Sequence, residues 1–208
     1  MTDTKENILN TSLKLFARDG YEAVSVSTIA GKLGMTKGAL YKHYKNKRDI
    51  FDSIVKRMYE IDEKRAQNYE TPKYEYEKQP EEYKTVSLHS FARFTLAQFE
   101  FWTQDEFAAD FRKMLMLEQY RSDEMAQLYK DCILSGPVKY TEDIFREMIK
   151  NGVLHDANPK QLAVEFYSPL YLLINLSDHT ESKAEYKALL EKHIENFIEK
   201  RGLLYEKD

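Results

Sequence analysis

The stretch from Ser25 to Tyr44 contains two short apolar patterns separated by Gly34, and its spacing limits the fold more than any other feature of the chain. Where two helices cross, a small residue must be followed four positions later by a residue able to turn, and then by an apolar residue on the second helix. Ala30, Gly34 and Leu40 satisfy this requirement. Two short helices joined by a tight glycine turn have the geometry of a helix-turn-helix, so the sequence predicts that motif here.

Local signals place helices on both sides of this turn. Ser25 and Thr36 are expected to cap two of them, because a side-chain hydroxyl at a helix N-terminus accepts backbone N–H groups. Gly20 suits the left-handed turn that often follows a helix. The predicted elements are a first helix from about Asp3 or Thr4 to Arg18, a second from Ser25 or Val26 to Leu33, a third over residues 37–44 and a fourth over residues 47–67.

The rest of the chain has a helical pattern to its end. From about residue 85 onward, apolar side chains recur at three- and four-residue intervals, which is typical of amphipathic helices. Glycine and proline are scarce, at 7 and 5 residues, and no alternating strand pattern of useful length occurs. We therefore predict an all-α protein with a three-helix domain over residues 1–48 and a larger helical domain over residues 49–208.

Charge is distributed unevenly between these two parts. Residues 1–48 carry nine Lys or Arg against four Asp or Glu, a net charge of +5. Since the whole chain has a net charge of -4, residues 49–208 carry -9. A compact basic segment on an acidic body indicates that one end of the protein meets a polyanion.

Composition disfavours several classes of protein. The single cysteine, Cys132, cannot form an internal disulfide, which fits a reducing compartment. The most apolar stretch, residues 162–176, is shorter than the roughly 20 residues that span a bilayer. The five histidines are scattered, and no glycine-rich phosphate loop or nucleophile elbow occurs. We expect a cytoplasmic protein that is no enzyme and that uses no metal, cofactor or membrane.

The third predicted helix presents a definite set of residues to solvent. We expect Leu40 and Tyr44 to point inward, because both lie on its apolar side. Helical geometry then turns the remaining side outward. A helix of this kind enters the major groove with its N-terminus leading, where cations and hydroxyl groups meet phosphates and base edges. The outward residues are Lys37, Gly38, Tyr41 and Lys42, with His43 near their edge.

The segment that contains these residues resembles a known family. Its sequence, ILNTSLKLFARDGYEAVSVSTIAGKLGMTKGALYKHYKNKRDIF, is similar to the N-terminal domain of the TetR family of bacterial transcriptional repressors. The matching pieces are LF...GY, IA..LG, KGALYKHY and KNKRDIF, and the resemblance covers about residues 4–55. Tyr44 stands where phenylalanine is more usual, and Val26 and Ser27 leave the second helix with few base-reading groups.

This resemblance implies a homodimeric repressor that binds a palindromic double-stranded DNA operator and is released by a small apolar or amphipathic effector. Two alternatives stay open: a ligand-dependent activator, and a helical protein-interaction module without sequence-specific DNA binding. The expected DNA-binding residues, with Lys42 added from helical geometry, are Ser25, Ser27, Thr36, Lys37, Gly38, Tyr41, Lys42, His43 and Lys47.

The resemblance also implies a ligand pocket among the middle helices. Polar residues on apolar faces are the better candidates, because burying them requires a partner. Aromatic residues at helical spacing are more often plain core than pocket lining. The candidate ligand-binding residues are His89, Arg93, Phe94, Gln98, Trp102, Phe111, Met114, Tyr129, Cys132, Tyr171 and Asn175.

The last two helical segments carry apolar stripes wide enough to bury two partners each. A four-helix bundle across a two-fold axis fits both this pattern and the family. The candidate residues of the dimer interface are Tyr167, Leu170, Ile174, Tyr186, Leu190, His193, Ile194 and Phe197.

Overall fold

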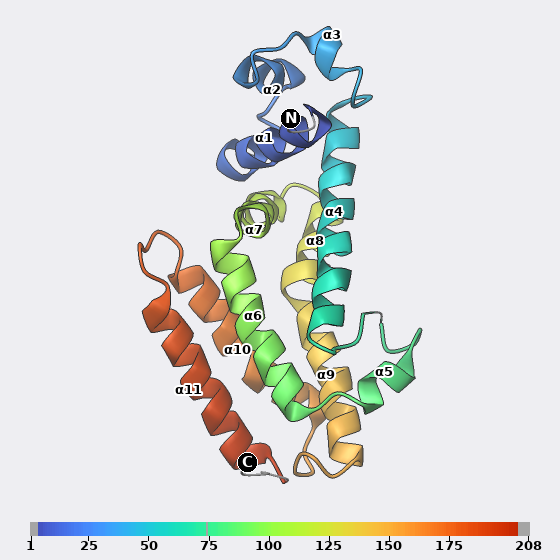
Figure 1. Ribbon diagram of the computed structural model, residues 1–208, viewed down its shortest axis with the longest axis vertical. Helices are drawn as coiled ribbons and strands as arrows, with labels where there is room; N and C mark the ends of the chain where they lie inside the picture. Colours follow the sequence, from blue (N-terminus) through green and yellow to red (C-terminus); the bar gives the residue numbers. More distant parts are fainter. Residues whose placement is uncertain (1–3, 74, 204–208) are drawn as a thin grey trace. The chain divides into compact units, whose positions relative to one another are not determined.

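The computed structural model describes residues 4–73 and 75–203, which form eleven helices and no strand (Figure 1). The all-α prediction is therefore confirmed. Asp3, the alternative start of the first helix, lies outside the described residues. The helices are α1 (Thr4–Asp19), α2 (Val26–Lys32), α3 (Lys37–Leu40), α4 (Lys47–Asn68), α5 (Pro80–Lys84), α6 (Leu88–Gln104), α7 (Glu106–Glu118), α8 (Asp123–Ile133), α9 (Ser135–Lys150), α10 (Pro159–Leu176) and α11 (Ala184–Arg201).

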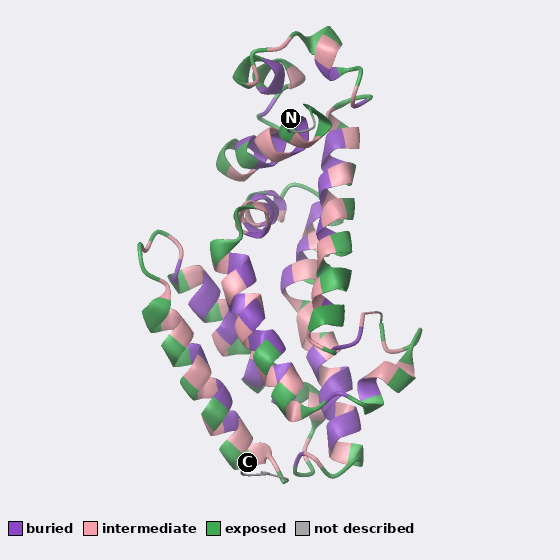
Figure 2. Ribbon diagram, viewed as in Figure 1, coloured by how far each residue is buried: buried purple, intermediate pink, exposed green. Residues whose placement is uncertain are grey.

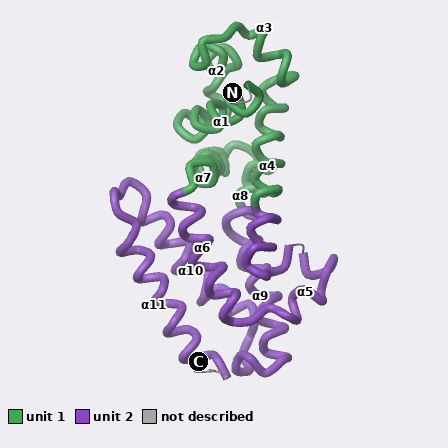
Figure 3. The backbone as a smooth tube through the Cα atoms, in the orientation of Figure 1, with its two compact units in different colours: residues 1–61, 105–129 green, residues 62–104, 130–208 purple. Residues whose placement is uncertain are grey.

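The chain divides into two compact units (Figure 3). Unit 1 contains residues 1–61 and 105–129, and unit 2 contains residues 62–104 and 130–208. The predicted division at residues 48 and 49 does not follow these units, because α4 is continuous through that position and α7 packs on α1. That residues 1–48 form the DNA-binding domain stays a prediction.

The predicted caps of the two short helices are confirmed. The Ser25 hydroxyl accepts the Thr28 N–H at 3.1 Å, and the Thr36 hydroxyl accepts the Ala39 N–H at 3.2 Å. Gly34, between the two helices, has a φ of 64°, a conformation that glycine adopts at little cost. Local hydrogen bonding therefore builds the turn that the sequence predicts.

The third helix is shorter than predicted. α3 ends at Leu40, and the residues up to Tyr44 continue it as turns. The amide of Lys42 bonds to the carbonyl of Ala39 at 3.3 Å, and the amide of His43 bonds to that of Leu40 at 2.9 Å. These bonds join residues three apart, so the backbone tightens beyond α-helical geometry.

The core of unit 1 lies where α1 packs against α7 and α2. The Tyr21 ring contacts the rings of Phe16 and Phe51 edge-on, with centroid distances of 5.1 Å to each. This places a residue that follows α1 against both α1 and α4. Buried residues, drawn in purple, occur along α1, α2 and α4 (Figure 2). Fully or nearly fully buried side chains of this core include Ile8, Leu13, Phe16, Ile29, Leu40, Ile50 and Ile54.

The core of unit 2 is aromatic and lies among α6, α9, α10 and α11. The ring centroids of Phe166 and Phe197 are 4.9 Å apart, and Phe145 stacks on Phe197 with a centroid distance of 5.4 Å. Phe91 of α6 stacks on Phe166, also at 5.4 Å. Such ring pairs add stabilisation beyond the area that they bury. None of the helices in the described part of the chain is long and apolar enough to cross a membrane.

Candidate nucleic-acid interface

The surface of α3 and the turn after it follows the predicted helical geometry. Leu40 and Tyr44 are buried, with exposures of 0% and 2%. The Tyr44 hydroxyl donates to the carbonyl of Lys5 in α1 at 3.2 Å, which anchors the end of the turn. Packing of these two side chains turns the remaining ones to solvent, and Tyr41 keeps 49% of its surface exposed. Lys37, Gly38 and Lys42 are likewise exposed.

Gly38 leaves open space on this surface. A Cβ added there would approach only the Thr36 hydroxyl, at 3.9 Å, which is ordinary van der Waals contact. Its φ is also outside the left-handed region, so neither backbone conformation nor packing within the chain requires glycine at this position. The exposed backbone of Gly38 can therefore be approached closely by a ligand from outside.

The lysines of this surface lack acidic partners. In the described residues, the ammonium groups of Lys37, Lys42 and Lys45 form no ion pair. Several other cations of unit 1 are paired with acids: Lys14 pairs with Glu106 at 2.8 Å, and Arg48 pairs with both Asp52 and Glu124. Uncompensated positive charge therefore gathers around α3, and it favours a polyanion.

Ser25, Ser27 and Thr36 are exposed at the starts of α2 and α3, where prediction puts them near phosphate. The capping bonds use the hydroxyl oxygens of Ser25 and Thr36 as acceptors. A hydroxyl that accepts one bond still has a proton to donate. Both residues can therefore cap their helices and donate to an anion at the same time.

Lys47 is placed differently from the other predicted contacts. Its ammonium donates to the Tyr21 carbonyl at 2.8 Å and lies 4.2 Å from the centroid of the Tyr21 ring. Only 22% of its side chain is exposed, and Glu22 lies 3.9 Å away. Lys47 thus joins α4 to the turn after α1, a role that its sequence position did not reveal. His43 is half-buried at the edge of the surface.

The candidate ligand residues do not form one group. Phe111, Met114 and Tyr129 belong to unit 1, and the others belong to unit 2. His89 and Arg93 are exposed on the solvent side of α6, so their prediction as polar residues on a buried face is wrong. The remaining unit 2 candidates are buried or half-buried: Phe94, Gln98, Trp102, Cys132, Tyr171 and Asn175.

Gln98 is the most informative of these residues. Its Oε1 atom is buried and accepts no hydrogen bond from the described residues. Close by on α4, Arg65 donates to the Ala97 carbonyl at 2.9 Å, and its guanidinium lies 4.0 Å from the Phe101 ring centroid. A buried carbonyl oxygen without a donor is costly, and a ligand-binding role for Gln98 stays a prediction.

A surface pocket of about 440 Å³ lies between α9 and α10 in unit 2. Tyr171 is the one predicted ligand residue in its lining, and Tyr167 stands beside it. The Tyr167 hydroxyl donates to the Ile133 carbonyl at 2.7 Å, so its ring is held in place. The other lining residues are Leu134, Ser135, Val138, Lys139, Glu142, Lys160 and Ser168.

Most of the predicted dimer residues pack inside unit 2 instead of facing outward. Leu170, Ile174, Leu190, Ile194 and Phe197 have exposures of 0% to 4%, because α10 and α11 cover each other and α6. Tyr167, Tyr186 and His193 are half-buried, and the His193 ring nitrogen contacts the Phe166 carbonyl at 3.1 Å. The large apolar side chains that these two helices expose are Val164, Leu172, Leu176 and Leu189.

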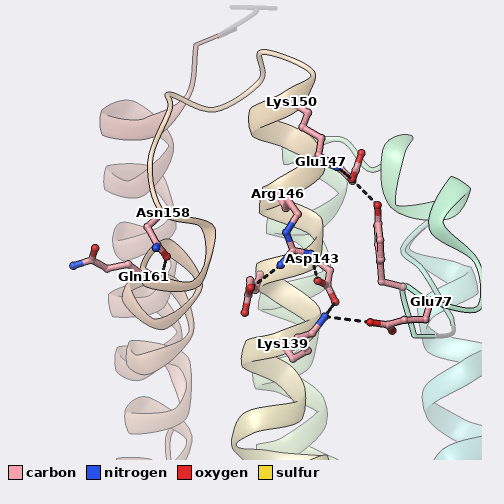
Figure 4. A network of polar contacts seen from close by, with 10 residues as sticks. Glu77, Lys139, Asp143, Arg146, Glu147, Lys150, Asn158 and Gln161 are labelled. Carbon is pink, nitrogen blue, oxygen red and sulfur yellow. Dashed lines mark hydrogen bonds and ion pairs between the residues drawn. The ribbon is translucent and has the colours of Figure 1, made fainter.

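A buried acidic cluster on α9 was missed by sequence reasoning (Figure 4). The Asp143 and Glu147 side chains are each 3% exposed. Arg146 donates to Asp143 at 2.5 Å, and Lys139 also pairs with it. Glu147 accepts from the Tyr76 hydroxyl at 2.8 Å and from Lys150 at 2.5 Å. The spacing of acids and bases on α9 was visible in sequence, but burial was not.

Comparison with known proteins identifies the N-terminal segment. Residues 8–54 match the family described as bacterial regulatory proteins, tetR family. The transposon Tn10 TetC protein of Escherichia coli is 42% identical over 53 residues, which cover 26% of this chain and 27% of that protein. The regulator AcrR of Shigella flexneri is 40% identical over 52 residues, which cover 25% and 24%. The chain thus spans about a quarter of the length of the curated relatives that it matches.

Solved structures extend the likeness to the fold of the whole chain. SmeT, the repressor of the Stenotrophomonas maltophilia multidrug efflux pump SmeDEF, superposes with a TM-score of 0.64 at 19% identity. The superposed region covers 97% of this chain and 91% of the SmeT chain. In its triclosan complex SmeT superposes with a TM-score of 0.70 at 16% identity, over 96% and 91% of the chains. At such low identity these likenesses show the fold alone.

Proposed function

We propose that this chain, whose residues 8–54 match the tetR family of bacterial regulatory proteins, is a sequence-specific DNA-binding transcriptional regulator of that family. The surface of α3 carries the proposal. Its exposed lysines form no ion pair within the described residues, and its tyrosine and glycine are open to an approaching ligand. A polyanion of regular shape fits this combination of charge, hydrogen-bonding groups and open backbone.

In this proposal α3 enters the major groove. Lys37 and Lys42 neutralise phosphates and fix the register of the protein on the duplex. The open backbone at Gly38 lets the chain approach the sugar–phosphate backbone. Tyr41 and His43 then donate or accept hydrogen bonds at phosphates or base edges. Lys47 contributes indirectly, because its ammonium holds the turn that precedes α2.

We further propose that the protein works as a homodimer on a palindromic operator. The support lies on α10 and α11, whose exposed faces carry Val164, Leu172, Leu176 and Leu189 at about half exposure. Apolar patches of this kind are usual where subunits meet. A two-fold axis would present two α3 surfaces to half-sites about one helical turn apart or more.

Release by a small apolar or amphipathic effector completes the proposal. SmeT is a repressor whose structure includes a triclosan complex, and it shares the fold of this chain. The unsatisfied Gln98 oxygen would accept a donor from such a ligand, and the Phe101 ring and the Arg65 guanidinium lie nearby. Release requires that the ligand bind one of two global states more tightly than the other.

Fluorescence anisotropy on DNA from the protein's own upstream region, or selected from random duplexes, tests the DNA-binding proposal. We expect tight, salt-sensitive binding by the wild type. A Lys37→Ala/Tyr41→Ala variant should bind on the order of a hundredfold more weakly while remaining folded, because it loses one charged and one hydroxyl contact.

The matched control is Lys56→Ala/Tyr59→Ala, which removes the same two residue types from α4. Tyr59 is 48% exposed, almost as much as Tyr41, so solvent exposure does not distinguish the two pairs. The control should bind DNA like the wild type. Equally weak binding by all three proteins to every selected sequence would instead favour the alternative of a protein-interaction module.

A further inference from the structure

The backbone of Tyr21 is held from two sides by distant elements. Its N–H donates to the Glu118 carboxylate at 3.0 Å, 97 positions along the chain, at the end of α7. Its carbonyl accepts from the Lys47 ammonium at 2.8 Å, at the start of α4. Tyr21 itself lies in the short connection from α1 to α2, so two helices outside the helix-turn-helix contact the segment that leads into it.

The Glu118 contact is built into the interior of unit 1. Glu118 is 1% exposed, and a carboxylate so buried is tolerated only when it is hydrogen-bonded. Gly20 is required beside it for two reasons. Its φ is 87°, and a Cβ at this position would lie 2.9 Å from the Glu118 Oε1 atom. A side chain at residue 20 would therefore strain the turn and displace the Glu118 carboxylate.

Tyr21 is also fixed by its ring, which packs between Phe16 and Phe51. Three residues further along, Val24 is buried at 2% exposure, and the Ser25 cap then begins α2. The connection between Tyr21 and α2 is thus short and is anchored at Tyr21 and Val24, although Glu22 and Ala23 between them are exposed. The position of the Tyr21 backbone therefore constrains where α2 starts and, through the tight turn at Gly34, where α3 lies.

The other polar contacts between α1 or α4 and the α7–α8 region are of a different kind. Lys14 pairs with Glu106, and Arg48 pairs with Glu124, but all four side chains are about half exposed or more. Exposed pairs contribute little and are screened by salt. The Glu118 contact differs because its carboxylate is buried. It also accepts a backbone N–H, so it fixes the path of the chain at Tyr21.

We propose that Glu118 is a positioning residue for DNA binding. It fixes the turn between α1 and α2, and thereby sets how α3 is presented, so that a shift of α7 changes the DNA-binding surface. This inference rests on the proposed function. In this proposal a shift of α7 within unit 1 reaches α3 through the Glu118 contact.

Three substitutions of Glu118, made in the whole 208-residue chain, separate the effect of side-chain length from the effect of charge. Glu118→Gln keeps an acceptor oxygen and removes the charge, Glu118→Asp keeps the charge but withdraws it by one methylene, and Glu118→Met removes both. Glu106→Gln is the control, because it removes an acid from the exposed side of the same helix. Hydrogen exchange at the Tyr21 amide and amide chemical shifts over residues 25–44 report the turn and the two short helices. Anisotropy on a selected duplex reports binding per folded molecule.

We expect faster Tyr21 exchange, shifted resonances over residues 25–44 and roughly tenfold or greater loss of specific affinity in the Asp and Met variants. The Gln and control variants should stay close to the wild type, and non-specific binding should change little in all four. A residue that only stabilises the fold would alter melting without altering affinity per folded molecule. If the Met variant does not fold, the Asp and Gln variants still decide the outcome.

Unchanged Tyr21 exchange in the Asp and Met variants would overturn the proposal, as would faster exchange with unchanged resonances over residues 25–44. Unchanged specific affinity in a variant whose Tyr21 amide is released would overturn it as well. If the wild type selects no DNA at all, the proposed function fails, and the exchange and chemical-shift data alone then decide whether Glu118 places α2 and α3.

Discussion

The lysines around α3 in unit 1 and the acids of α9 in unit 2 place their charge in opposite ways. Unit 1 carries lysines around α3 that face solvent and form no ion pair within the described residues. Unit 2 buries two acids of α9, Asp143 and Glu147, and surrounds each with cations or hydroxyls (Figure 4). Charge left uncompensated at a surface is available to a polyanion. Charge neutralised inside a unit instead holds neighbouring segments together.

This difference predicts that removing a buried acid of unit 2 lowers stability, whereas removing an exposed lysine of unit 1 lowers DNA affinity. In unit 2 the network joins α9 to the segment before α5, because Tyr76 donates to Glu147 and Lys139 pairs with Glu77. Its loss should lower the free energy of unfolding and leave DNA affinity per folded molecule unchanged. In unit 1, removal of a lysine near α3 should lower DNA affinity and leave the free energy of unfolding unchanged.

The largest effect is expected for Asp143→Ala. It leaves Arg146 and Lys139 without their buried acceptor and should lower the free energy of unfolding by about 2 kcal/mol, less than for a fully buried pair because both cations can turn to water. Chemical denaturation measures the loss. The control is Glu165→Ala, which breaks an acid–arginine pair in the same unit whose partners are 44% and 39% exposed. Its effect should stay below about 1 kcal/mol, and equal losses in both variants would remove the contrast between buried and exposed charge.

A pH dependence comes next in size. Burial alone would raise the pKa of the Glu147 carboxyl, but hydrogen bonds from Lys150 and Tyr76 outweigh it and hold the pKa below its usual value of 4.5. A carboxyl whose folded pKa is lowered stabilises the fold above its unfolded pKa, and that stabilisation is lost as pH falls through the folded value. Wild type should therefore be more stable than Glu147→Gln near pH 7.

The difference between these two proteins should shrink as pH falls from about 4.5 downward. Denaturant midpoints measured for both proteins between pH 7 and pH 3 give this comparison directly. A constant difference over that range would mean that the Glu147 charge does not contribute to the stability of unit 2.

The smallest effect is expected for Lys42→Ala in unit 1. If its ammonium binds a phosphate, the slope of log affinity against log salt should become shallower by about 0.9. The free energy of unfolding should not change, because Lys42 is exposed and forms no ion pair within the described residues. Lys192→Ala, on the solvent side of α11 in unit 2, is the control, and an equal change of slope in both variants would contradict a localised contact surface.

Much of the α2–α3 region could be predicted from sequence because its signals are local. The caps at Ser25 and Thr36 bond three residues ahead, and the inward placement of Leu40 and Tyr44 follows from helical spacing within one turn. The short extent of α3 was not predicted, since residues 41–44 have the composition of either a helix or a series of turns.

The dimer candidates show where periodicity stops being informative. α10 and α11 carry apolar residues on more than one side, and sequence alone did not tell which side faces inward. The structure buries Leu170 and Leu190 and exposes Leu172 and Leu189, only one or two positions away. The choice depends on how α6, α10 and α11 pack, which no spacing within a single helix specifies.

Sequence by itself determined the all-helical fold, the caps of α2 and α3 and the resemblance of residues 8–54 to the tetR family, because these depend on bonds and side-chain patterns a few residues apart. Tertiary structure decided that α7 joins α1 in unit 1, that Lys47 turns toward Tyr21, and that Glu118 accepts the Tyr21 amide from 97 positions away. Those contacts link segments far apart in the chain. They form only when whole helices pack together, and the sequence around each contacting residue does not indicate its distant partner.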